Sequence, residues 1–89
     1  MDIDVKNQLV SRTGELIIFA DANPGNSIKN ISKVLDIDYN FATKIVRRCE
    51  EAGLLKTEIV SREKQVQSTR KGVEVANSLS KIKEALKIE

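Results

Sequence analysis

The stretch EEAGLLKTEIVSREKQVQSTRKG, residues 50–72, changes its pattern of apolar residues twice. Its helical opening stops at Gly53, which is typical of a helix that ends in a left-handed glycine. Beyond Gly53 apolar and polar residues alternate with a period of two, which predicts two short strands. The alternation comprises Leu55, Thr57 and Ile59 against Lys56, Glu58 and Val60, followed by Val66 between Gln65 and Gln67. The polar run 61–64 predicts the turn between the strands, and Thr69 predicts the cap of a last helix that reaches about Ile88.

The residues before Gly53 predict two helices joined by a tight turn. Asp38 is a good N-cap for a helix that runs to Ala52, and Ser27 is a good N-cap for a shorter helix before it. The stretch 35–38 breaks the helical period between the two. The inward residues expected on the longer helix are Ala42, Ile45, Val46 and Cys49, and those on the shorter helix are Ile28, Ile31, Val34 and Leu35.

A further helix precedes residues 23–26, where Pro24 and Gly25 favour a turn. Gly14 lowers helix stability by about 1 kcal/mol relative to alanine. We therefore expect this helix to begin near Ser11, with a looser segment before it. Apolar residues, together with Thr13, recur here with helical spacing. They are Val5, Leu9, Thr13, Leu16, Ile17 and Ala20.

Length and composition allow one small domain. The chain has 89 residues, of which 40% are apolar and only 3% aromatic, so isoleucine, leucine and valine must fill the core. The net charge of +2 does not by itself indicate a nucleic-acid-binding protein. Residues 28–71, however, hold ten basic residues against six acidic ones, whereas the rest of the chain holds five against seven. The middle of the chain is therefore basic and its flanks are mildly acidic.

The sequence also indicates the compartment. Cys49 is the only cysteine, which excludes an intramolecular disulfide and fits a reducing environment. Its place on an inward helical stripe favours a buried small hydrophobe over a redox switch. The longest apolar run, 16–20, is too short to span a bilayer, and the opening residues with Asp2 and Asp4 lack a signal-peptide pattern. We therefore expect a cytoplasmic protein without membrane association.

The stretch ISKVLDIDYNFATKIVRRCEEAGLL, residues 31–55, resembles the helix-turn-helix of small prokaryotic winged-helix regulators of the MarR and ArsR kind. In these an L-x-I turn leads to a recognition helix that ends in a basic pair, two acids, one residue and G-L-hydrophobic. The matching positions are Leu35, Ile37, Arg47, Arg48, Glu50, Glu51, Gly53, Leu54 and Leu55. STRKG, residues 68–72, resembles the T-x-x-G restart of the helix after the wing.

The resemblance covers residues 13–86. Over this range the chain is similar above all to compact archaeal winged-helix proteins that dimerise through one C-terminal helix. Two departures stand out. Asp36 occupies a turn position where family members often carry glycine. Tyr39, Asn40 and Phe41 open the recognition helix, where small polar residues are usual.

Pattern and resemblance together predict a mainly α fold with a small β-ribbon (α+β), a winged helix-turn-helix with a long C-terminal helix. Residues 1–69 would form the winged domain, with the helix-turn-helix at 27–53 and the wing at 54–69. Residues 70–89 would form the C-terminal helix.

The expected partner is double-stranded DNA. A recognition helix reads the major groove with its outward residues near the N-terminus, which are Tyr39, Asn40, Thr43, Lys44 and Arg47. Arg62 and Lys64 at the wing tip are expected to reach the minor groove or its phosphates. The start of the shorter helix, at Ser27 and Lys29, is expected to hold a phosphate. We expect a transcriptional regulator that reads a near-palindromic site.

The last helix carries a heptad-like seam of apolar residues spaced 4, 3 and 4, formed by Val75, Leu79, Ile82 and Leu86. The interpretation we favour is a coiled coil with the same helix of a second subunit, which gives a homodimer. The alternative is that the seam folds back on the first helix.

Catalysis is not expected. The chain has no histidine, one cysteine cannot build a thiolate zinc site, and the four glycines form no phosphate-cradling loop. Glu50 and Glu51 are adjacent on a helix and point about 100° apart. We therefore expect no catalytic residues, no metal and no cofactor, and the sequence leaves any small-molecule effector unknown.

Two other functions remain open at this point. One is an architectural, chromatin-like protein that binds duplex DNA without sequence preference. The other is a winged-helix module for protein–protein interaction, favoured by the modest net charge and by Tyr39 and Phe41 at the exposed start of a helix.

Overall fold

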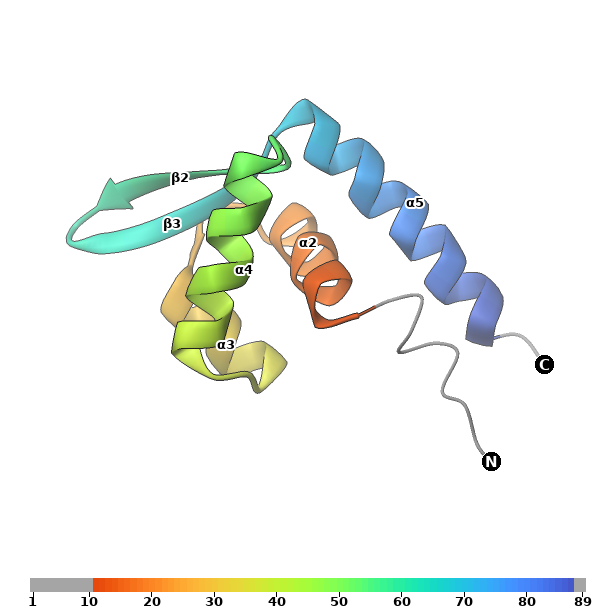
Figure 1. Cartoon of the computed structure of the whole chain (residues 1–89), viewed down its shortest axis with the longest axis horizontal. Coiled ribbons are helices and arrows are strands. Elements are labelled where there is room, and N and C mark those ends of the chain that lie inside the picture. The colour runs from red at the N-terminus through yellow and green to blue at the C-terminus, as the bar shows by residue number, and fades with distance from the viewer. Residues whose placement is uncertain (1–10, 88–89) are drawn as a thin grey trace.

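The computed structural model of the chain describes residues 11–87, and these form helices and one sheet. In chain order the elements are α2 (Arg12–Ala22), β1 (Asn26–Ser27), α3 (Ile28–Leu35), α4 (Tyr39–Glu51), β2 (Leu55–Val60), β3 (Glu63–Ser68) and α5 (Arg70–Lys87). Figure 1 shows α2 between α4 and α5, and the β2–β3 hairpin projecting from the body on the side opposite to α5. The predicted α+β fold with a long last helix is confirmed.

The helices begin where the sequence places their caps. The Ser27 hydroxyl accepts a hydrogen bond from the Asn30 amide at 3.1 Å. The Asp38 carboxylate accepts from the amides of Asn40 and Phe41 at 2.9 and 3.2 Å. These contacts satisfy amide groups that the first helical turn leaves without a partner. Both predicted caps are confirmed, and α2 begins directly after Ser11.

The core is aliphatic and lies between the helices and the sheet. All four residues predicted to face inward from α4 are buried, as are Leu55 and Val66 of the sheet. The prediction that Val34 is buried is wrong. Val34 is 55% exposed because the inward stripe of the short α3 runs through Ile28, Ile31 and Ser32, about a quarter turn away. Thr13 is exposed because it stands in the first turn of α2, at the margin of the core. Val5 and Leu9 lie outside the described residues.

The sheet has a third strand that the sequence did not indicate. The strand order is β1-β3-β2 and all pairs are antiparallel, with Asn26 opposite Val66 and Ser27 opposite Gln65. The turn of the wing is also shorter than the predicted run 61–64, because Glu63 and Lys64 already belong to β3. Ser61 and Arg62 form it with left-handed φ angles of 51° and 69°. Two consecutive left-handed residues give a turn whose twist matches that of the flanking strands.

The last helix packs against α2 (Figure 1). The Thr69 hydroxyl accepts from the Gly72 amide at 3.0 Å, which confirms the predicted cap. Gly72 and Ala76 are buried, and Lys83 forms an ion pair with Glu15 of α2 at 3.1 Å. The body-facing stripe of α5 therefore runs beside the predicted seam.

The seam is divided between two environments. Val75 and Leu79 pack against the core, whereas Ile82 is 40% exposed and Leu86 is half-buried. The alternative in which the seam folds back on the first helix thus describes its first half. The second half is apolar surface outside the core.

Within residues 11–87, no helix combines the length and the apolar character needed to cross a membrane.

Candidate nucleic-acid interface

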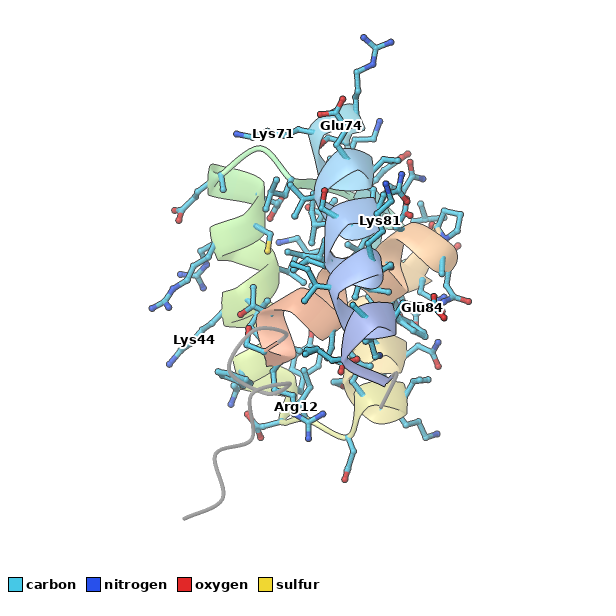
Figure 2. The ribbon with its side chains drawn as sticks, turned by 90° about the vertical axis from the view of Figure 1, so that its right-hand side faces the viewer. Arg12, Lys44, Lys71, Glu74, Lys81 and Glu84 are labelled. Carbon is cyan, nitrogen blue, oxygen red and sulfur yellow. The ribbon has the colours of Figure 1, made fainter. Side chains whose placement is uncertain are left out.

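Helix α4 presents one of its faces to solvent. Its inward stripe is fully occupied by core contacts, and Asn40, Lys44 and Arg47 stand on the opposite side, all exposed. Figure 2 shows Lys44 projecting from α4 away from α2 and α5. The Thr43 hydroxyl donates to the Tyr39 carbonyl at 2.9 Å, so only its methyl group and lone pairs remain for a partner. The exposed face therefore offers an amide, two cations and a small polar side chain.

The wing is held at a fixed angle to α4 by side-chain contacts at the base of the hairpin. The Thr57 hydroxyl of β2 donates to the Glu50 carboxylate at the end of α4, over 2.8 Å. The Thr69 hydroxyl donates to the Gly53 carbonyl at 2.6 Å, and Lys71 donates to the Ala52 carbonyl at 3.2 Å. These bonds join the C-terminal end of α4 to both ends of the hairpin. Glu50 therefore has a structural role as a hydrogen-bond acceptor.

A cleft of about 510 Å³ separates the wing from the first turns of α3 and α4. It brings residues at the start of α3 and α4 together with residues of the wing, and five of them belong to the sets predicted to contact DNA. Its lining residues are Ser27, Ile28, Lys29, Ser32, Tyr39, Arg62, Glu63 and Lys64. Three cations against one carboxylate give this cleft a positive balance.

The place of Glu63 between Arg62 and Lys64 in the sequence indicates a negative charge at this cleft, whereas the contact made by Ser32 was not predicted. Glu63 lines it beside the cations of the wing tip. The Ser32 side chain is nearly buried, and its hydroxyl donates to the Lys29 carbonyl at 2.8 Å, so it fixes the backbone that carries Lys29.

A second groove, of about 380 Å³, lies on the other flank of α4. Thr13 of α2 lines it together with Phe41, Lys44, Ile45 and Arg48. Phe41 is 47% exposed there. Lys44 therefore lines this second groove, whereas Tyr39 lines the cleft beside the wing.

The cations predicted to contact DNA are not engaged within the described part of the molecule. Residues 11–87 form one ion pair, which joins Lys83 of α5 to Glu15 of α2 and involves neither α4 nor the wing. Arg12 and Lys71 are hydrogen-bonded to carbonyl groups, but Lys44, Arg47 and Arg62 are exposed and make no such bond among these residues. Their charges are thus available to a partner.

The chemistry of Cys49 follows from its position in the core. The side chain is 3% exposed, and burial raises the pKa of the thiol because the thiolate would lose its hydration. The prediction of a buried small hydrophobe is confirmed. Over the described part of the chain, no group of three metal-ligating side chains of histidine, cysteine, aspartate or glutamate comes together.

Solved structures share this arrangement, and among them MepR and SlyA are transcription regulators. MepR, a transcription regulator of the Staphylococcus aureus multidrug efflux pump MepA, has a TM-score of 0.82 at 16% identity, over 94% of this chain and 71% of its own. The transcriptional regulator SlyA has a TM-score of 0.79 at 21% identity, over 93% of this chain and 61% of its own. AF1382 from Archaeoglobus fulgidus has a TM-score of 0.84 at 18% identity, over 94% of this chain and 99% of its own. A second MepR structure, with a TM-score of 0.79, is a complex with DNA.

No protein-family model and no curated protein matches the chain. The structural matches establish the class by its fold, which is the winged helix-turn-helix. The resemblance to MarR-type regulators, predicted from residues 31–55 and 68–72, is confirmed at the level of the fold. In this fold α3 and α4 are the helix-turn-helix, and the β2–β3 hairpin is the wing.

Proposed function

We propose that the protein is a homodimeric transcriptional regulator that binds double-stranded DNA in a sequence-specific manner. The observation that carries the proposal is the cleft beside α4, in which Lys29 and Tyr39 meet Arg62 and Lys64 of the wing. A sugar–phosphate strand running between a major groove occupied by α4 and a minor groove touched by the wing would pass through this cleft. MepR, which has the same fold, has been captured in complex with DNA.

Three residues of α4 can form hydrogen bonds with base edges. Asn40 can bond both edge atoms of adenine, and Lys44 or Arg47 can bond guanine.

Ser27 and Lys29 at the start of α3 are proposed to hold a phosphate, since the amide groups and the positive end of the helix dipole attract anions there. At the wing tip, Arg62 keeps a left-handed φ of 69° that favours glycine or asparagine. The two-residue turn requires this φ, and the turn sets Arg62 at the tip of the wing.

The proposed dimer forms through the second half of the seam. Helix α5 has 18 residues and is therefore about 27 Å long, which carries Ile82 and Leu86 beyond the core contacts of Val75 and Leu79. Two copies joined there would present two α4 helices, which bind half-sites about one helical turn apart in a near-palindromic site.

The test is a fluorescence-anisotropy titration of the protein with a random-sequence duplex pool at low and moderate salt, followed by selection from the pool. We expect salt-sensitive binding and enrichment of a near-palindromic sequence. Equal affinity for all sequences with a steep salt dependence would identify the architectural DNA-binding protein instead. Absence of binding at low salt would favour the protein-interaction module, for which the half-exposed Phe41 in the second groove is the supporting observation.

Arg47→Ala is expected to weaken binding to the selected duplex by about 1–3 kcal/mol and to relax the preference at one base pair. The reason is that Arg47 is exposed on the outward face of α4, where a bidentate contact to guanine is sterically open. Arg48→Ala is the matched control, because it removes the same charge at a residue that lines the second groove, on the other flank of α4. An equal loss for both variants on every sequence would show that Arg47 contacts phosphate only.

Glu63→Gln is expected to strengthen binding. Glu63 adjoins Arg62 and Lys64 at the cleft, and the strand register turns its side chain to the face opposite to Lys64. Its carboxylate still repels, at short range, a phosphate that these cations attract. We expect about a 3- to 10-fold higher affinity at low salt, falling as added salt screens the repulsion. Titrations of the wild type and the variant at two salt concentrations measure this. Glu58→Gln, on the wing but away from this cleft, is the control and should change the affinity less.

A further inference from the structure

The wing carries an apolar side chain that the core does not use. Ile59 is 74% exposed, more than any other large apolar residue in the described part of the chain. It lies on β2, an edge strand of the sheet, close to the turn at the tip. Because it buries little surface in the monomer, its side chain is available to a partner.

The strand register fixes the direction of this side chain. Ile59 is paired with Lys64, and the next pair on the same face is Thr57 with Val66. Val66 is fully buried against the body, so this is the inner face of the wing. Ile59 and Lys64 therefore extend the inner face beyond the edge of the core, with Lys64 lining the cleft. Val60 points to the outer face.

The surroundings of Ile59 select the chemistry of the partner. One cation, Lys64, stands directly opposite, and a second, Arg62, occupies the adjoining turn. A purely apolar protein surface would remove water from both charges without replacing their hydrogen bonds, which costs free energy. A surface with apolar groups between rows of anions fits better. The wall of a DNA minor groove is of this kind, since deoxyribose rings lie there between phosphates.

We propose that Ile59 is the wing's apolar contact with the minor groove and packs on its deoxyribose wall, while Lys64 and Arg62 hold the flanking phosphates. This inference rests on the proposed function, because it requires α4 in the adjacent major groove. It assigns two separable roles to the inner face. The cations account for the dependence of affinity on salt, and Ile59 provides a contact that does not depend on salt.

The experiment uses the full chain and a duplex that the wild type selects from a random pool. Ile59→Thr keeps the β-branched shape but shortens the side chain and makes it polar, and the site is too exposed for the change to affect the core. We expect about 5- to 30-fold weaker binding, with an unchanged slope of log affinity against log salt. Lys64→Gln should instead reduce that slope by about one unit. Hydroxyl-radical footprinting, which reports on exposed deoxyribose hydrogens, should lose protection in the flanking minor groove with Ile59→Thr alone.

Val60→Thr is the matched control on the opposite face of the same strand, where the side chain is 38% exposed. It should bind and protect the duplex like the wild type. Equal affinity and equal footprints for the wild type and Ile59→Thr would overturn the inference and leave the regulator function intact. A wild type that binds no duplex at either salt concentration would overturn both.

Discussion

Gly72→Ala is expected to destabilise the protein by about 3 kcal/mol, which is a large part of the stability of a domain this small. The first turn of α5 crosses the backbone at Leu54 so closely that an added Cβ would lie 1.9 Å from the Leu54 carbonyl oxygen. That oxygen accepts the hydrogen bond of the Thr69 amide at 3.1 Å, so it cannot move away without loss of the contact that starts the helix. The backbone at Leu54, and not a flexible side chain, would therefore have to move.

The experiment has to show whether Gly72→Ala lowers or raises the stability of the protein. On helix propensity alone, alanine in place of glycine within α5 should stabilise the protein by about 1 kcal/mol. Urea unfolding at a fixed protein concentration measures the difference, with Ser78→Ala on the exposed side of α5 as the control. A Gly72→Ala midpoint at or above that of the wild type would contradict the close approach of α5 to Leu54.

The elements that sequence reasoning placed correctly are those with local signals. Ser27, Asp38 and Thr69 cap helices through their own neighbours, and Gly53 has the left-handed φ of 80° that ends α4. Asp36 also has a left-handed φ, of 55°, which explains why glycine is usual at this turn and why aspartate is tolerated. Such features involve few residues close in sequence, so composition and spacing are sufficient to predict them.

The features that were missed depend on distant contacts. Strand β1 exists only because Asn26 and Ser27 lie beside β3, nearly forty residues later, and alone they have the pattern of a turn and a cap. The period of two placed Ile59 on the face of Thr57, but it does not say how far the body extends beneath the ribbon. Local spacing sets a side chain's direction, and only tertiary packing decides whether anything lies there to cover it.

The same limit applies to the candidate site. The outward residues of α4 follow from its inward stripe, and Tyr39, Asn40, Lys44 and Arg47 are exposed as predicted, whereas Thr43 is partly buried. The cleft could not be predicted, because Ser27, Tyr39 and Lys64 meet only when α3, α4 and the wing are packed together. Glu63 lies between Arg62 and Lys64 in the sequence, so its position at the wing tip was indicated. Whether these residues contact DNA remains a prediction that the variants above test.

The double variant Ile82→Glu/Leu86→Glu is expected to convert the proposed dimer into a monomer and to weaken DNA binding by about 100-fold or more. The physical reason is that a dimer engages its second half-site at a high effective concentration, an advantage of about 10² to 10⁴ that a monomer lacks. These two residues are the informative ones in the seam, since Val75 and Leu79 also pack against the core and their replacement would unfold the body. Glutamates at the contact would place like charges opposite each other across the two-fold axis.

Light scattering measures the mass of the variant, and anisotropy with the selected duplex measures its affinity. Lys81→Glu is the matched control, because it changes the charge of each chain by the same two units at an exposed position of α5 (Figure 2). The control should remain a dimer, and any loss of affinity that it shows gives the part due to charge. A double variant that keeps the dimer mass would place the interface elsewhere. A monomeric wild type that binds a single half-site would instead show that Ile82 and Leu86 form no contact with a second subunit.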